Sequence, residues 1–269
     1  MRAVFFDLDG TLLNQKHELS SINMEAVERL KQRGIIVCLA SGRTSLSMRP
    51  FYHQLKLTSP LISYNGARII YSDTEMDESP LPPYVVTQLI ELAHEHEIHL
   101  NLYDDERWYA EDANSLATTE YAAIAHLKPH QINFNRLKDQ PMTKALYIGT
   151  PQQLKILDTL INQMLSKTIE TTSSMHNFLE VLSRGVNKGE AIKKVCQRLE
   201  IPIDEVMAFG DGLNDKEMII TAGHGVAMLN GRAQVKAVAD AIAPHHADHG
   251  VAQYLDQYFN LGLKRSLAT

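Results

Sequence analysis

The sequence predicts an α/β fold in which one parallel sheet is interrupted by an inserted α+β unit. At both ends of the chain, short apolar runs alternate with segments of helical periodicity, as in strand–helix–strand units. Over residues 81–185, short strands and helices are mixed instead. We therefore expect residues 1–80 and 186–269 to form one core domain and residues 81–185 to form a separate inserted domain.

The first part of the chain carries the clearest alternation. Ala3 to Phe6 is an apolar run of strand formers, and Ser20 or Ser21 can cap the helix that follows. Gly34 ends that helix, and the continuous apolar run after it is expected for a strand covered on both faces. The expected strands lie at 3–6, 35–40 and 61–64, and a second helix, flawed by Pro50, at 45–55.

The inserted unit begins after a stiff Pro-rich segment at residues 79–83, which is typical of a linker. Together with Gly185 at the far end, this segment would border a hinge. Within the unit we expect helices near 85–93, 115–127 and 151–165 and strands near 99–103, 107–110, 144–148, 168–172 and 178–182. The first alternation then returns, with helices near 188–199, 215–222 and 233–239 and strands near 206–209 and 225–227.

Composition excludes several classes of protein. Hydrophobic residues make up 44% and charged residues 22% of the 269 residues, which is ordinary for a globular protein. With a net charge of -6 the chain lacks the excess of basic residues that is typical of nucleic-acid-binding proteins, and no apolar stretch is long enough to span a bilayer. Cys38 and Cys196 imply no disulfide framework, so we expect a cytoplasmic protein. The charge and the lack of a spanning stretch lead us to expect neither nucleic-acid nor membrane partners. The oligomeric state is not readable from the sequence.

Three apolar strands end in polar signatures: D-L-D-G-T at 7–11, S-G-R at 41–43 and G-D-G-L-N-D at 210–215. In an open parallel sheet, the carboxyl ends of the strands lie along one edge, where ligands bind. These signatures are therefore expected to meet there, and Lys188, at the start of a helix, can join them.

Asp7, Asp9 and Asp211 supply the carboxylates of this edge. Converging carboxylates repel one another unless a cation is present, and oxygen ligands suit Mg²⁺ better than zinc. Asp and Gly at strand ends are also ordinary turn formers. Because both acidic signatures occur together with Ser41, Gly42 and a suitably placed lysine, the functional interpretation is favoured.

These motifs resemble the haloacid dehalogenase (HAD) superfamily of phosphotransferases. The insertion lies between the second and third signatures, which is similar to the Cof-type (class IIB) hydrolases, and the pieces I-S-Y-N-G-A (62–67) and G-V-N-K-G-E-A (185–191) are similar to that subgroup as well. The resemblance implies a Rossmann-like core with an inserted α+β cap of the C2, type B kind. It also implies a magnesium-dependent phosphatase.

The resemblance further assigns roles to individual residues. Asp7 would attack phosphorus and form an aspartyl-phosphate, while Asp9 would act as general acid and then as general base. Mg²⁺ would be held by Asp7, by the backbone carbonyl of Asp9 and by Asp211. Five groups would bind the phosphoryl oxygens, namely the Lys188 ammonium, the Ser41 hydroxyl, the amides of Gly42 and Leu8, and Asn214.

Some of these assignments have alternatives. Asp215 is expected to orient waters or Lys188 behind the metal site. Lys188 could instead be a solvated lysine at a helix start, and Ser41 or Asn214 could cap a helix. Arg43 could contact substrate or the cap, or form a surface salt bridge.

The predicted function is hydrolysis of small phosphorylated metabolites. Sugar phosphates are the expected substrates, with pyridoxal phosphate a further candidate because R-P-F-Y at 49–52 is similar to a stretch in pyridoxal phosphate phosphatases of the subgroup. Two alternatives stay open: a phosphate-binding regulator without turnover and a phosphomutase.

Overall fold

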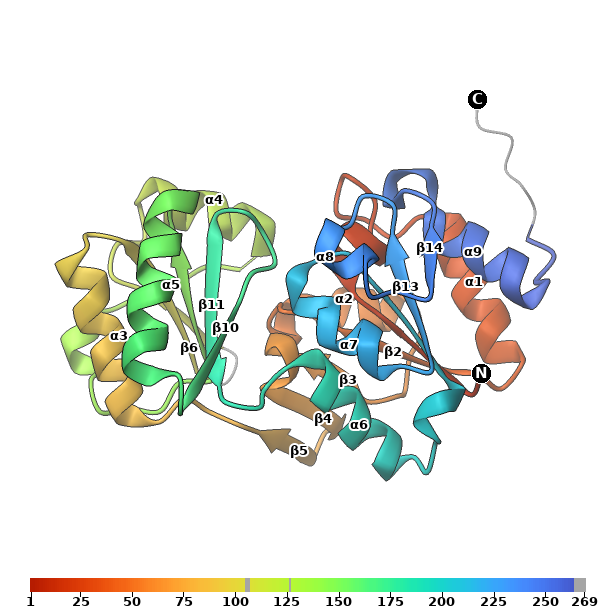
Figure 1. Ribbon diagram of the computed structural model, residues 1–269, viewed down its shortest axis with the longest axis horizontal. Helices are drawn as coiled ribbons and strands as arrows, with labels where there is room; N and C mark the ends of the chain where they lie inside the picture. The colour runs from red at the N-terminus through yellow and green to blue at the C-terminus, as the bar shows by residue number, and fades with distance from the viewer. Residues whose placement is uncertain (105–106, 126, 264–269) are drawn as a thin grey trace.

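The computed structural model describes residues 1–104, 107–125 and 127–263. Within these residues the strands form two sheets, one in each of two bodies that lie side by side (Figure 1). Both ends of the described chain lie in the body with the larger sheet, and the middle of the chain forms the other. We call the two bodies the core and the cap.

The core sheet is α/β with a parallel centre. Its order is β14-β13-β12-β1-β2-β3-β4-β5, and every pairing from β14 to β3 is parallel. The strands are β1 (Ala3–Phe6), β2 (Ile36–Ala40), β3 (Leu61–Ser63), β4 (Arg68–Ser72), β5 (Glu75–Glu78), β12 (Val206–Gly210), β13 (His224–Met228) and β14 (Ala241–Ala243). The helices are α1 (Ser21–Gln32), α2 (Ser45–Gln54), α6 (Lys188–Arg198), α7 (Lys216–Thr221), α8 (Ala233–Lys236) and α9 (Gly250–Phe259).

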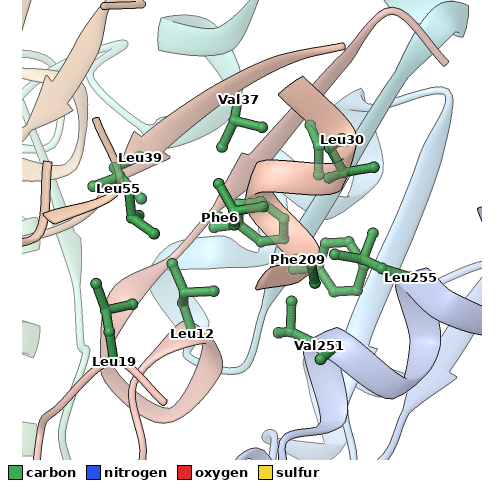
Figure 2. Packing of buried hydrophobic residues seen from close by; sticks show 14 of the residues in the cluster. Phe6, Leu12, Leu19, Leu30, Val37, Leu39, Leu55, Phe209, Val251 and Leu255 are labelled. Atoms are coloured by element: carbon green, nitrogen blue, oxygen red, sulfur yellow. The ribbon is translucent and has the colours of Figure 1, made fainter. Parts of the chain in front are cut away.

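Helices cover both faces of this sheet because its central strands are apolar on both sides. Val4 and Phe6 of β1 join the cluster beneath α1 and α9, whereas Ala3 and Phe5 join the cluster beneath α6 and α7. Figure 2 shows the first cluster, in which Phe6 stacks on Phe209 with ring centroids 5.2 Å apart. The two buried layers fix the ends of β1, β2 and β12, where the site lies.

The cap sheet is mixed, with the order β10-β11-β9-β6-β7-β8. Its strands are β6 (His99–Asp104), β7 (Arg107–Ala110), β8 (His130–Gln131), β9 (Lys144–Ile148), β10 (Ile169–Thr172) and β11 (Phe178–Ser183), and its helices are α3 (Pro83–Glu95), α4 (Leu116–Ala125) and α5 (Pro151–Leu165). One face packs on α3 and α5. The other carries an aromatic cluster that includes Tyr103, Trp108 and Tyr121.

Two chain segments join the bodies, one before α3 and one after β11, and both lie at the same end of the cap (Figure 1). The Ser183 hydroxyl donates a hydrogen bond of 2.6 Å to the Pro80 carbonyl, so the two crossings touch. No helix among the described residues is long and apolar enough to cross a membrane.

Most predicted elements are present within one or two residues of their predicted bounds. Two strands that were not predicted, β4 and β5, extend the sheet as an antiparallel hairpin, and β5 is an exposed, mostly acidic segment without an apolar pattern. Two further elements, β14 and α9, follow the last predicted helix and were not predicted. The helix expected at 115–127 ends at Ala125, and residue 126 lies outside the described residues.

Candidate active site

Asp7 stands at the carboxyl end of β1, where only 4% of its surface is exposed. The turn that follows reverses the chain at Gly10, whose φ of 76° lies in the left-handed region that favours glycine. A Cβ there would also come within 2.4 Å of Asp211 Oδ2. The glycine of the first signature therefore lets the β1 turn pack directly against the carboxylate at the end of β12.

Lys188, the first residue of α6, is fully buried between two carboxylates. Its ammonium lies 2.6 Å from Asp7 Oδ1 and 2.5 Å from Asp215 Oδ1. Burial alone would lower the pKa of Lys188, but Asp215 and Asp7 outweigh it and hold the pKa above its ordinary value. Lys188 is therefore a fixed cation beside Asp7 and not a solvated lysine.

Asp215 is held from two sides. While Oδ1 contacts Lys188, Oδ2 accepts hydrogen bonds of 2.9 Å from the backbone amides of Asp211 and Gly212. Because both oxygens are engaged, Asp215 is placed to orient Lys188 and to shape the turn after β12. Asp7, Asp211 and Asp215 each offer an oxygen, and these oxygens lie within 4.8 Å of one another.

The electrostatics of this cluster favour a bound cation. Burial, followed by the charge of Asp215, raises the pKa of Asp7 well above its ordinary value and that of Asp211 to about 7. The pKa rises because removing carboxylates from water while placing them beside one another makes the ionised forms costly. A hard divalent ion with oxygen ligands would remove that cost, so the residues present fit Mg²⁺.

Asp9 sits apart from this cluster, in a separate ion pair. Arg43 donates two hydrogen bonds to its carboxylate, Nε to Oδ2 at 2.6 Å and Nη2 to Oδ1 at 2.7 Å, and His17 Nδ1 lies 2.9 Å from Oδ1. Burial would raise the pKa of Asp9, but the hydrogen bonds from Arg43 and His17 outweigh it and hold the pKa below its usual range. His17 was not predicted as a site residue, because it stands in an irregular loop without a motif.

The Arg43 side chain is 8% exposed, so its pair with Asp9 is not the surface salt bridge considered from the sequence. Its contact is instead with the second aspartate of the first signature. Arg43 also stacks over the Phe51 ring, with 5.5 Å from the guanidinium carbon to the ring centroid. The bidentate pair links the loop after β2 to the turn after β1.

The loop after β2 brings Ser41 and Gly42 to the same edge. Ser41 Oγ accepts a hydrogen bond of 3.2 Å from the Arg43 amide, which leaves the hydroxyl hydrogen able to donate. Thr44, and not Ser41, caps α2 by accepting from the Ser47 amide. The helix-cap alternative for Ser41 is therefore wrong.

Asn214 and Leu8 approach the site in different ways. Asn214 Nδ2 donates a hydrogen bond of 2.9 Å to Asn65 Oδ1, and the Asn214 side chain caps neither the turn that contains it nor α7. Leu8 buries its side chain in the core cluster, so its backbone amide is the part that can serve a ligand.

The core signatures and the cap enclose a common pocket of about 60 Å³. The core side is polar and includes Asp7, Asp9, Ser41, Gly42, Asp211 and Asn214. The cap side adds Lys144, Ser174 and Glu180 to an apolar set made up of Tyr121, Ile124, Ala125, Leu146, Met175 and Phe178. Sequence patterns did not single out these cap residues, since a lysine or glutamate in a strand and an aromatic residue in a helix carry no motif.

Known proteins resemble the chain over almost its full length. Residues 4–255 match the haloacid dehalogenase-like hydrolase family. An HMP-PP phosphatase of Serratia proteamaculans is 30% identical over 96% of this chain and 95% of its own. A 5-amino-6-(5-phospho-D-ribitylamino)uracil phosphatase of Bacillus subtilis is 27% identical over 96% of this chain and 97% of its own.

A solved haloacid dehalogenase-like hydrolase from Bacteroides thetaiotaomicron has the same fold, with a TM-score of 0.86 at 31% identity over 96% of this chain and 99% of that one. The agreement covers the core sheet and the cap sheet alike, because nearly the whole of both chains is superposed. The family match, the shared fold and the acidic cluster all indicate the same family of hydrolases. The chain belongs to the haloacid dehalogenase-like hydrolases, and within them it is a phosphatase.

Proposed function

We propose that this phosphatase hydrolyses small phosphate monoesters through an aspartyl-phosphate on Asp7, with Mg²⁺ as its cofactor. The observation that carries the proposal is the cluster of Asp7, Lys188 and Asp215, which are buried, with the partly buried Asp211, at the ends of β1 and β12. A carboxylate beside a fixed ammonium and a second acidic oxygen is suited to receive a phosphoryl group.

Asp7 attacks phosphorus, the bond to the leaving oxygen breaks, and the phosphoryl group is transferred to the carboxylate. The Lys188 ammonium, the Ser41 hydroxyl, the amides of Gly42 and Leu8, and the Asn214 side chain stabilise the charge on the phosphoryl oxygens. Asp7, Asp211 and the backbone carbonyl of Asp9 would hold Mg²⁺. Bound there, the ion would neutralise charge, so that an anionic nucleophile could approach an anionic phosphate.

Asp9 transfers the protons. It protonates the leaving alkoxide and then takes a proton from the water that attacks the aspartyl-phosphate, which regenerates Asp7 and releases inorganic phosphate. In this structure Asp9 is held ionised by Arg43 and His17. We infer that substrate binding loosens the pair with Arg43, so that Asp9 takes up a proton from the solvent before it acts as an acid.

The cap side of the pocket suggests the substrate class. Aromatic and apolar side chains, including Tyr121, Leu146 and Phe178, face the polar core residues. Such a lining favours a planar or apolar leaving group over a sugar with many hydroxyls. Among the candidates from the sequence, this supports a heteroaromatic phosphate such as pyridoxal phosphate over a sugar phosphate. The phosphatase of B. subtilis that resembles the chain acts on a uracil-bearing phosphate.

A phosphate-release assay over a panel of metabolites tests the proposal. We expect hydrolysis of p-nitrophenyl phosphate and of heteroaromatic phosphates in the presence of Mg²⁺, with activity lost in a chelator and restored by Mg²⁺. Asp7→Asn should lower kcat by at least about 10³-fold while the circular dichroism spectrum is kept. Unchanged turnover in Asp7→Asn would exclude the mechanism.

The two alternatives from the sequence predict different products. A regulator without turnover would bind phosphate compounds but release none, and it would not need Asp9. A phosphomutase would return the phosphoryl group to substrate, so that an isomer would accumulate in place of inorganic phosphate. Product analysis after one long incubation distinguishes the three.

A further inference from the structure

A buried ion pair in the cap faces the core. Lys144 of β9 and Glu180 of β11 have side chains that are 3% and 2% exposed, and Lys144 Nζ lies 3.0 Å from Glu180 Oε2. An ion pair this deeply buried is costly unless its remaining hydrogen-bonding capacity is satisfied. Much of that capacity is satisfied by the core, which suggests a role other than holding the cap together.

Two contacts cross from the cap to the core. Lys144 Nζ donates a hydrogen bond of 2.8 Å to the Gly42 carbonyl, and Glu180 Oε2 accepts one of 2.8 Å from Asn65 Nδ2. The other oxygen of Glu180 accepts from the Ser174 hydroxyl within the cap. With these partners filled, the pair has little capacity left for a substrate, and its outward contacts all go to core residues around the phosphate-binding groups.

The loop at 41–43 has all three of its carbonyls occupied. The Ser41 carbonyl accepts from the Asn65 amide at 2.9 Å, and the Arg43 carbonyl accepts from the Tyr64 amide at 3.0 Å. The donors of these two bonds belong to the core. The Gly42 carbonyl is the one that accepts from the cap, through Lys144.

This third bond matters because it fixes a particular peptide plane. The carbonyl and amide of a trans peptide are held rigidly in one plane, so that anchoring the Gly42 carbonyl also orients the Arg43 amide. That amide donates to Ser41 Oγ, which leaves the Ser41 hydroxyl hydrogen for a ligand. A chain of bonds thus connects Lys144 in the cap to Ser41, whose hydroxyl is proposed to donate a hydrogen bond to the phosphate.

The other half of the pair acts on a second phosphate-binding residue. Asn65 donates from Nδ2 to Glu180, and its Oδ1 accepts 2.9 Å from Asn214 Nδ2. Asn65 holds this position in a tight turn with a φ of 57°. A Cβ on Gly42 would lie only 3.0 Å from Asn65 Oδ1 and 3.3 Å from Glu180 Oε2, so the close approach leaves little room for a larger residue.

We propose that Lys144 and Glu180 are positioning residues through which the closed cap sets the phosphate-binding groups of the core, Lys144 through the loop at 41–43 and Glu180 through Asn65 and Asn214. The inference rests on the proposed phosphate-binding roles of Ser41, Gly42 and Asn214. Cap closure then completes the phosphate site as well as covering it, so an open cap binds phosphate weakly.

Lys144→Met tests the proposal because it removes the donor while keeping an unbranched side chain. Inorganic phosphate binding is measured by calorimetry in the presence of Mg²⁺, together with kcat and KM for p-nitrophenyl phosphate. We expect phosphate affinity and kcat/KM each to fall about tenfold or more, since a bond to a charged donor is lost. Lys138→Met, which removes a partly exposed cap lysine paired with Glu91, is the matched control and should behave as wild type.

A second variant separates positioning from stability, because Lys144→Met leaves Glu180 buried without its cation. In Lys144→Met/Glu180→Leu the unpaired charge is gone, so the thermal midpoint should recover while phosphate affinity stays low. Wild-type phosphate affinity in either folded variant would overturn the inference. Absence of turnover in the wild type would instead sink the proposed function, and the calorimetric comparison would still decide whether the cap sets the phosphate site.

Discussion

The core and the cap have comparable hydrophobic clusters, yet their functional residues were not equally readable. In the core, polar signatures directly follow apolar strands, and a parallel sheet gathers strand ends at one edge. Asp7 and Asp211 meet for that reason although some two hundred positions separate them. In the cap, Lys144 and Glu180 lie within strands, and their importance comes from the surface on which they dock.

The difference teaches that topology makes some sites visible in a sequence and leaves others hidden. A parallel sheet has one functional edge, and a motif placed there needs no further information. A mixed sheet that docks through one face has no such edge, because its side chains alternate between faces all along each strand. We therefore expect changes in the core to affect chemistry most, and changes in the cap to affect binding and selectivity.

The largest effect should come from Lys188→Met. The substitution removes the buried cation between Asp7 and Asp215 and leaves two carboxylates facing each other. Breaking a buried ion pair by removing one partner costs about 3–5 kcal/mol of stability, and we expect kcat to fall about 10³-fold or more. Urea unfolding and single-turnover kinetics measure the two effects. Retained activity would show that Lys188 is only structural.

Asp211→Asn should weaken Mg²⁺ binding and yet raise the stability of the metal-free protein. Burial and Asp215 raise the pKa of Asp211 to about 7 from an ordinary 3.8. Without metal, its ionisation therefore opposes folding, with a cost that is absent below about pH 4, grows as the pH rises to about 7 and is complete above that. In a chelator at pH 8 we expect the variant to melt at a higher temperature than wild type, and the gain to vanish near pH 4.

With excess Mg²⁺ the order should reverse. The wild type is stabilised by the bound ion, whereas Asp211→Asn binds it weakly and loses turnover. Melting curves of both proteins with and without Mg²⁺ at pH 8 make the comparison. A variant that gains as much from Mg²⁺ as wild type would remove Asp211 from the metal site.

Many of the strands and helices could be predicted from the sequence, because the local apolar patterns agree with the overall strand–helix alternation. The positions of β1, β7, β9 and α5 were predicted to the residue, since their apolar patterns are bounded by turn and cap signals. The Asp9–Arg43 pair could not be predicted, because its geometry depends on how two loops meet. The β5 strand could not be predicted either, because it is exposed and mostly acidic and has no apolar pattern.

A moderate effect is expected from Arg43→Met, which sharpens the comparison within the core. Arg43 and His17 together hold the pKa of Asp9 below its usual range against the effect of burial. Removing the guanidinium should raise that pKa. As the pH falls, Asp9 would then lose the ionised form needed to hydrolyse the aspartyl-phosphate at a higher pH than in the wild type. The pair with Arg43 re-forms once the leaving group has departed, so we expect the acidic limb of the kcat profile to move up by about one pH unit or more.

Arg43→Lys is the matched control for this shift, since it keeps the charge but not the bidentate geometry. The acidic limb of its kcat–pH profile should lie between those of wild type and Arg43→Met. An acidic limb that is the same in all three proteins would mean that Arg43 releases Asp9 before the rate-limiting step and does not set its protonation during turnover.

The smallest effect should come from the cap wall, through Tyr121→Leu. The Tyr121 ring lines the pocket and packs edge-on against Trp108 and Phe178. Leucine keeps an apolar surface but removes the face on which an aromatic leaving group could stack, a contact of about 0.5–1.5 kcal/mol. We expect kcat/KM for a heteroaromatic phosphate to fall up to about tenfold, with little change for a sugar phosphate and none in the affinity for inorganic phosphate. Equal losses for both substrates would indicate that Tyr121 supports the cap fold and not its selectivity.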